Sequence, residues 1–185
     1  MPAAPRLARA ALHFGEEPCI SGTRGSGTVF FSGCVLSCAF CQNAKISRGG
    51  VGKTVTPARL ADIFCALEAA GAHNINLVSP TPFVPAIIEA LSRYKPHIPI
   101  VYNCGGYERV ETLKRLEGLV DIYLPDLKYT DCALSLSLSG AEDYFDFAAP
   151  AVAEMVRQTG GAVFDADGIL QRGTVIKAAK VRVCK

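Results

Sequence analysis

Short apolar runs alternate with amphipathic segments along most of the chain. Each run has the length of a strand and is rich in β-branched or aromatic residues, which is typical of buried β-strands. We therefore predict strands at residues 27–31, 74–78, 98–102, 120–124 and 173–178.

The segments between these runs carry apolar residues at the spacing of one helix face. Thr56 and Pro57 begin the first such segment as N-cap and first helical residue, and Gly71 ends it. Thr81 and Pro82 repeat the starting signal, so we expect Thr81 to be a plain helix cap. Helices are predicted around the apolar stripes of residues 60–67, 84–91 and 110–116, and over residues 147–158.

The alternation of strands and helices predicts parallel strands joined by right-handed crossovers. A complete eight-unit barrel needs about 250 residues, or about 31 per unit. The chain has 185 residues. After a lead-in segment, residues 1–26, it has room for about five units. We predict an α/β fold with a partial TIM-type (β/α) barrel in residues 27–185. The pattern does not distinguish this barrel from an open α/β sheet, which is the alternative.

In both architectures, ligands bind beyond the carboxyl ends of the strands. The polar or unusual residues that follow the predicted strands are therefore expected at one mouth. They are residues 34–41, 79–81, 103–106 and 126–128.

Composition excludes several classes of protein. Hydrophobic residues make up 50% of the chain, charged residues 19%, and the mean hydropathy is +0.25, so the chain is not intrinsically disordered. The net charge is +2 and the charges are interspersed, which argues against nucleic acid as a partner. The sequence has neither a membrane-length apolar stretch nor a secretory signal, so we predict a cytoplasmic protein without membrane contact. We interpret the basic residues near the C-terminus as a solvated end: Arg172, Lys177, Lys180, Arg182 and Lys185.

The chain contains eight cysteines, and three of them, Cys34, Cys38 and Cys41, lie within eight positions directly after the first predicted strand. In a reducing compartment, clustered cysteines bind metal or carry out redox chemistry more often than they form disulfides. A C-x3-C-x2-C loop places three thiolates on neighbouring corners of a four-iron cluster and leaves the fourth iron open for a ligand. A structural zinc site and a thioredoxin-like pair of Cys38 and Cys41 are the alternatives.

The remaining cysteines are scattered. We expect them to be ordinary buried small residues, and the roles of Cys19 and Cys104 stay open. Cys65 lies inside a predicted helix, and we assign it, like Cys132, to packing.

The loop from Gly33 through Cys34, Cys38, Phe40 and Cys41 resembles the signature of the radical S-adenosylmethionine (radical SAM) superfamily. The flanking segments GSGTVFFSGC, VYNCGGYE and DIYLPDLKY are similar to the subgroup related to the pyruvate formate-lyase activating enzyme. This resemblance extends over residues 7–173 and implies a partial (β/α)6 barrel.

The resemblance also implies the chemistry. The three cysteines would hold a [4Fe–4S] cluster, and the open iron would be chelated by SAM. Reductive cleavage of SAM, with an electron donor such as flavodoxin or ferredoxin, would give a 5′-deoxyadenosyl radical that abstracts a hydrogen atom. The substrate would be, for example, a glycine of a partner protein.

Four residues are implied as SAM contacts: Phe40, Asn103, Asp126 and Lys128. Phe40 would pack near the adenine, with a plain packing aromatic as the alternative. An extended backbone sends the side chains of Asp126 and Lys128 to the same face, where the carboxylate suits ribose hydroxyls and the ammonium suits the methionine carboxylate; an exposed charge pair is the alternative. Residues 79–81 occupy the place of a Gly-Gly-Glu loop in many members, but here they contain no acid.

The C-terminal sequence IKAAKVRVCK departs from the family pattern. We therefore expect a chain truncated at the C-terminus, with an uncertain fifth strand and no sixth. This departure leaves two non-enzymatic alternatives, a degenerate iron–sulfur protein that binds a cluster without turnover and a zinc-binding interaction module.

Overall fold

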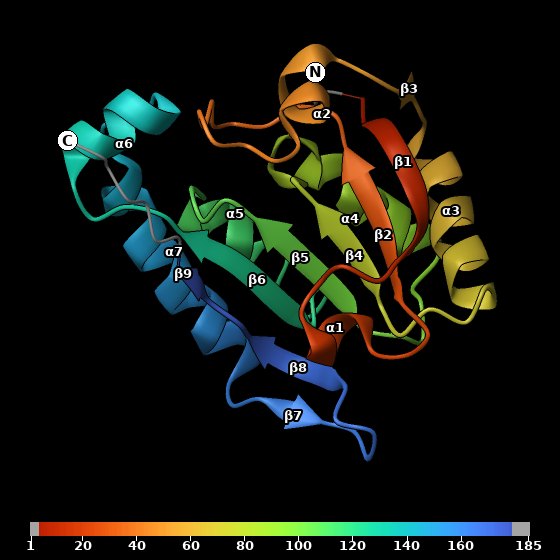
Figure 1. Cartoon of the computed structure of the whole chain (residues 1–185). Helices are drawn as coiled ribbons and strands as arrows, with labels where there is room; N and C mark the ends of the chain where they lie inside the picture. Colours follow the sequence, from red (N-terminus) through yellow and green to blue (C-terminus); the bar gives the residue numbers. More distant parts are fainter. Residues whose placement is uncertain (1–3, 179–185) are drawn as a thin grey trace.

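A mostly parallel sheet organises the computed structural model, which describes residues 4–178 (Figure 1). The strand order is β3-β1-β2-β4-β5-β6-β8-β7, and the sheet does not close. Five strands in the middle of this order are parallel to one another and follow the predicted runs: β2 (Ser26–Phe31), β4 (Ile75–Val78), β5 (Ile100–Cys104), β6 (Ile122–Leu127) and β8 (Leu170–Thr174). The prediction of an α/β fold with a partial TIM-type barrel is confirmed.

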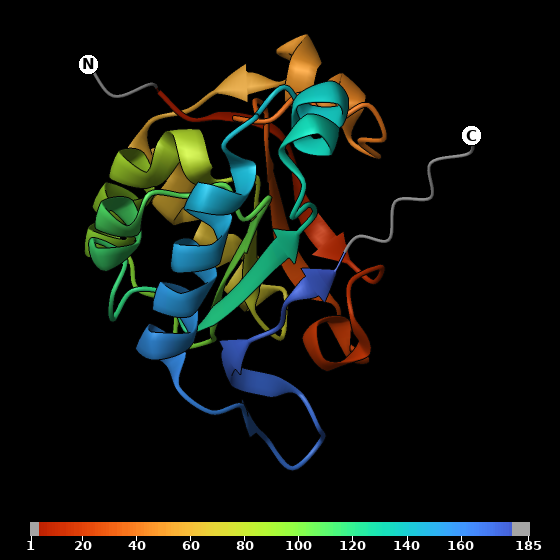
Figure 2. The same ribbon diagram turned by 90° about the vertical axis from the view of Figure 1, so that its left-hand side faces the viewer.

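Helices from the crossovers between parallel strands cover the outer face of the sheet (Figure 2). Thr56 accepts a hydrogen bond from the Arg59 N–H at 3.1 Å, so it caps α3 as predicted. The prediction that Thr81 caps a helix was wrong. A short 3₁₀ turn (Thr81–Phe83) precedes α4, and the Thr81 hydroxyl donates to Glu108 instead of accepting from the helix backbone. The helices are α3 (Pro57–Ala69), α4 (Val84–Arg93), α5 (Val110–Lys114) and α7 (Tyr144–Thr159).

Two strands lie about two residues later than predicted. Pro99 has no N–H to donate, and β5 begins only after it, at Ile100. The Val120 N–H still bonds the Leu116 carbonyl at 3.2 Å, which delays the start of β6. Asn103 and Asp126 are therefore the last residues but one of β5 and β6 and do not lie beyond the strand ends.

The lead-in segment contributes to the sheet, which its sequence did not predict. β1 (Arg6–His13) pairs antiparallel with β2, and the short β3 (Lys53–Thr54) pairs with β1. α1 (Pro18–Ser21) packs Ile20 against the inner face of the sheet. The segment is thus part of the folded unit.

The predicted last strand is divided in two. β8 and β9 (Lys177–Ala178) both run parallel to β6, and β7 (Val163–Phe164) forms an antiparallel edge beside β8. The interpretation of Lys177 as a solvated end was wrong, because its register against Asp126 turns its ammonium group into the mouth. Lys180, Arg182, Lys185 and Cys184 lie outside the described residues. Two further short helices, α2 (Ala44–Gly49) and α6 (Cys132–Ser139), flank the mouth.

No helix within residues 4–178 has the length and apolarity needed to cross a membrane.

The Tyr144 hydroxyl, at the start of α7, joins the ends of β5 and β6. It accepts from the Lys128 N–H at 3.1 Å, and its proton is shared between the carbonyls of Gly105 and Asp126, each at 2.8 Å. Gly106 (φ +78°) lies so close that a Cβ there would be 2.2 Å from the Asp126 carbonyl oxygen. The buried phenol and the glycine together set the spacing of the two strand ends.

We predict that Tyr144→Phe lowers the free energy of unfolding by about 1–3 kcal/mol, because buried backbone groups lose their partner. Urea unfolding measures this change. The matched control is Tyr107→Phe, since the Tyr107 ring stacks on Tyr144 but its hydroxyl bonds Asp143 at the surface. Equal effects of the two variants would contradict the role of Tyr144.

Candidate functional site

The three clustered cysteines lie in the loop between β2 and α2, at the carboxyl edge of the sheet. They contact a small apolar cluster formed by this loop, α6 and the start of α7, which includes Leu36, Tyr129 and Tyr144. Cys38 is buried, and Cys34 and Cys41 are partly buried. The loop is therefore packed against the sheet and helices, and all three thiols lie at the mouth.

Each thiol has a hydrogen-bond partner. The Leu36 N–H donates to the Cys34 sulfur at 3.5 Å, the Ser139 hydroxyl donates to the Cys38 sulfur at 3.0 Å, and the Cys41 sulfur lies 3.4 Å from the Ser47 hydroxyl. Such donors stabilise sulfur that carries negative charge, as metal-bound thiolates do.

Burial raises the pKa of the Cys34 thiol, the Leu36 N–H opposes this shift, and the neighbouring Cys38 and Cys41 add to it. A free thiolate at Cys34 would therefore be unfavourable here without a cation beside it.

The donor set fits an iron–sulfur cluster better than one metal ion. Within residues 4–178, no three His, Cys, Asp or Glu side chains converge closely enough to hold a single ion. A structural zinc ion would need four ligands around one point. A four-iron cluster takes its thiolates at separate corners, so it does not need three sulfurs around one point.

Asp126 and Lys128 share one face, as predicted. Their carboxylate and ammonium groups lie 2.6 Å apart, and the Lys177 ammonium is 3.6 Å from the other Asp126 oxygen. Burial opposes the charge of Lys128, but Asp126 outweighs it and raises the pKa of the lysine. Lys128 is therefore charged near neutral pH, and a ligand meets a preformed pair of Lys128 with Asp126.

Asn103 lies on the inner face of β5, between two charged side chains. Its amide donates to the Glu16 carboxylate at 3.3 Å, and its oxygen accepts from the Lys177 ammonium at 3.0 Å. Asn103 is thus joined to Asp126 through Lys177, a residue that the sequence did not indicate.

The Phe40 ring is 42% exposed at the mouth. The Phe40 and Tyr129 rings meet edge to face at a centroid distance of 6.3 Å, and the Lys128 ammonium lies over the Phe40 ring, 5.7 Å from its centroid. The ring is therefore held by two contacts, and its exposed part is free for a flat ligand.

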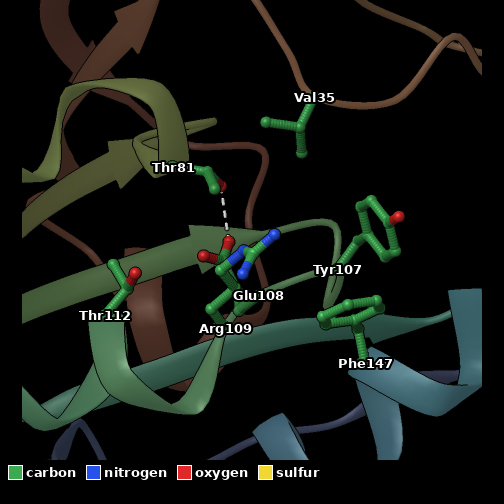
Figure 3. A pocket seen from close by; sticks show the side chains of 7 residues that line it. All are labelled: Val35, Thr81, Tyr107, Glu108, Arg109, Thr112 and Phe147. Atoms are coloured by element: carbon green, nitrogen blue, oxygen red, sulfur yellow. Dashed lines mark hydrogen bonds between the residues drawn. The ribbon is translucent and has the colours of Figure 1, made fainter.

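Glu108 is the functional candidate that the sequence analysis missed. It follows the Gly105-Gly106 turn, is only 3% exposed, and accepts hydrogen bonds from the Thr81 hydroxyl at 2.5 Å and the Tyr102 hydroxyl at 3.3 Å (Figure 3). Burial raises the pKa of Glu108 to about 7 despite these donors. Residues 79–81 contain no acid, but Thr81 is hydrogen-bonded to Glu108, which follows the next strand, β5.

Glu108 and Thr81 line a cavity of about 200 Å³. Val35 of the cysteine loop, Tyr107 and Phe147 form its apolar side (Figure 3). The only hint of this site in the sequence was the position of Glu108 just after two glycines at a strand end.

Two of the scattered cysteines were assigned wrongly. Cys65 and Cys132 are exposed, because each occupies the solvent side of its helix. Cys104 is buried on the helix side of β5, and Cys19 is partly buried. Neither exposed cysteine belongs to the cluster around the loop.

We predict that Glu108→Gln changes the pH dependence of stability. Between about pH 4.5 and pH 7 the unfolded chain releases the Glu108 proton while the folded chain keeps it, so this carboxyl lowers the free energy of unfolding by about 3 kcal/mol as pH rises. The variant lacks this loss. Its free energy of unfolding relative to the parent should therefore rise by about 3 kcal/mol from about pH 4.5 to about pH 8.

Urea unfolding at several pH values measures the difference. The control is Glu111→Gln at an exposed position, whose free energy of unfolding relative to the parent should not change with pH. If the value for Glu108→Gln relative to the parent does not change with pH either, burial does not perturb the Glu108 carboxyl.

Comparisons with known proteins show the family of the chain. A model of the radical SAM superfamily matches residues 28–146, more than half of the chain, and includes the cysteine loop, Glu108, Asp126 and Lys128. The uncharacterized protein MJ0674 of Methanocaldococcus jannaschii is 36% identical over 144 residues, which are 73% of this chain and 41% of that protein. The chain thus spans less than half the length of this relative. With the matched family and the three-cysteine loop at the mouth of a partial barrel, the chain belongs to the radical SAM superfamily.

Proposed function

We propose that the protein is a radical SAM enzyme in which Cys34, Cys38 and Cys41 hold a [4Fe–4S] cluster. One observation carries the proposal: Leu36 of the cysteine loop and the Lys128 side chain both lie against Gly105, so the loop and the pair of Lys128 with Asp126 come together at the ends of β5 and β6. The family generally uses this cluster together with SAM.

The side chains around the loop support SAM as the ligand. Lys128 would bind the methionine carboxylate, Asp126 would bind the ribose hydroxyls, and Asn103 would orient Asp126 through Lys177. The exposed Phe40 ring would pack against the adenine. The apolar wall of Leu36, Tyr129 and Tyr144 would keep water from the thiols.

When bound, the cluster and SAM supply reductive cleavage of a C–S bond, which takes one electron and yields methionine and a 5′-deoxyadenosyl radical for hydrogen abstraction. The electron would come from a donor protein such as flavodoxin or ferredoxin. The substrate would be a glycine in a partner protein, as the similarity to the activating-enzyme subgroup suggests. The cytoplasmic location stays a prediction.

One experiment tests the enzymatic proposal. The protein is reconstituted anaerobically with iron and sulfide, then given dithionite and SAM, and 5′-deoxyadenosine is measured. We expect the nucleoside from the parent and none from the Cys38→Ala control. Parent and control at the same level would contradict the proposal. A cluster whose spectrum ignores added SAM would instead favour a non-catalytic iron–sulfur protein.

We predict that Cys34→Ala, Cys38→Ala or Cys41→Ala abolishes the cluster, because each removes one of its three anchors. Iron and sulfide content after reconstitution measures this loss. Cys65→Ala and Cys132→Ala are the matched controls, since both thiols are exposed and lie outside the loop. Normal iron content in all three loop variants would exclude the cluster assignment.

We predict that Asp126→Ala and Lys128→Ala keep the cluster but weaken SAM binding. Each removes one charge-assisted contact, which corresponds to about a 10- to 150-fold loss of affinity. Titration of SAM into the reconstituted variants gives the dissociation constants. Asp62→Ala and Lys95→Ala change the same charges at exposed positions and should bind SAM like the parent. If all four variants bind alike, Asp126 and Lys128 are only a structural ion pair.

A further inference from the structure

We propose that Ser139, oriented by Tyr129, sets the reduction potential of the cluster through a hydrogen bond to the Cys38 sulfur. The inference rests on the proposed function, because it concerns the cluster that the three thiols would hold. It assigns a role to two buried hydroxyls that the proposed function does not yet use.

The contact at Cys38 differs from those at the other two thiols. The Ser139 hydroxyl lies 3.0 Å from the Cys38 sulfur, and both residues are buried. The hydrogen-bond partners of Cys34 and Cys41 are 3.5 and 3.4 Å away, and both of these thiols are partly exposed. A hydrogen bond in a region that excludes water is electrostatically stronger than one at the surface. Cys38 therefore has the strongest hydrogen bond of the three sulfurs.

The direction of this hydrogen bond follows from its neighbours. A cysteine sulfur that ligates iron carries no proton, so it can only accept. The Tyr129 hydroxyl lies 2.7 Å from the Ser139 hydroxyl and is buried with it. With the Ser139 proton directed at the sulfur, the Ser139 oxygen can accept the phenol proton, and both buried hydroxyls are satisfied. Tyr129 therefore donates to Ser139, and Ser139 donates to Cys38.

The backbone holds Ser139 and the cysteine loop in register. Ser37 and Ala39 flank Cys38 in the loop. The Ser37 N–H donates to the Ser139 carbonyl at 3.0 Å. The Ala39 N–H donates to the Leu138 carbonyl, also in the last turn of α6, at 2.7 Å. Neither bond involves the Ser139 hydroxyl, so a substitution at this position removes the donor without releasing the loop.

The donor at Cys38 favours the reduced form of a cluster. Reduction adds one electron from the donor protein, and part of this negative charge resides on the ligating sulfurs. A hydrogen bond to sulfur therefore stabilises the reduced form more than the oxidised form, and such bonds are among the determinants of iron–sulfur potentials. The Tyr129 phenol strengthens the Ser139 donor, because hydrogen bonds in a chain polarise one another. The two hydroxyls thus make the cluster easier to reduce.

The test measures the midpoint potential of the reconstituted cluster in the parent and four variants. Dithionite and mediator dyes set the potential in the absence of SAM, and EPR of the reduced cluster gives the reduced fraction, so the readout does not depend on turnover. The variants are Ser139→Ala, Ser139→Thr, Tyr129→Phe and the control Ser135→Ala. Ser135 is also buried in α6, but its hydroxyl donates to the backbone carbonyls of Cys132 and Glu142. Iron content and thermal unfolding establish that each variant is folded and loaded.

We expect Ser139→Ala to lower the ratio of reduced to oxidised cluster at a given potential about tenfold. For a one-electron couple this is a midpoint potential about 59 mV lower. Tyr129→Phe keeps the Ser139 donor but loses its orientation, so a smaller shift of the same sign is expected. Ser139→Thr keeps the hydroxyl and should have the midpoint potential of the parent. Ser135→Ala should also leave the potential unchanged, even if it lowers the unfolding temperature.

The outcomes separate this inference from the proposed function. If the parent has a reducible cluster and Ser139→Ala has the same midpoint potential, the inference is overturned while the proposed function stands. Equal shifts in Ser139→Ala and Ser135→Ala would reflect a general loosening of α6 and would also overturn it. If Ser139→Ala retains no iron, Tyr129→Phe decides, and an unchanged potential in that variant overturns the inference. If the parent itself holds no cluster, the proposed function fails first.

Discussion

The geometry of the mouth depends on one buried hydroxyl. Tyr144 bonds backbone atoms at the ends of both β5 and β6, and its ring belongs to the apolar cluster that receives the cysteine loop. A shift of α7 would therefore move the thiols and the pair of Asp126 and Lys128 together. Sites assembled from several strand ends need such a shared anchor, because each loop alone has too few contacts to hold its position.

Charge is concentrated in the region where the fold is least able to solvate it. Asp126 is shared by two lysines, and Glu108 has only neutral donors. The first arrangement is electrostatically satisfied, whereas the second lowers the stability of the fold at neutral pH. Carboxyls whose pKa is raised by burial in this way are typical of functional sites, where stability is often lower than it could be.

Most of the central elements could be predicted from local pattern. The runs that became β2 and β4 have the β-branched and aromatic residues of buried strands, and Thr56 with Pro57 is a start signal that acts within one helical turn. The prediction was wrong in two ways. β5 and β6 begin late because of local features, Pro99 and a turn closed by Val120, whereas β1 exists only because β2 offers it an edge.

The candidate site divides in the same way. The spacing of Cys34, Cys38 and Cys41, and the two-residue interval from Asp126 to Lys128, are local properties, so the sequence by itself determined both groups. The sequence could not determine that Lys177 joins Asn103 and Asp126, nor that Thr81 meets Glu108 from 27 residues away. Those contacts depend on the register of the parallel strands and on the burial of side chains between strands and helices. Only the tertiary structure decides both, because the pattern of apolar residues along the chain does not indicate which strand ends become neighbours.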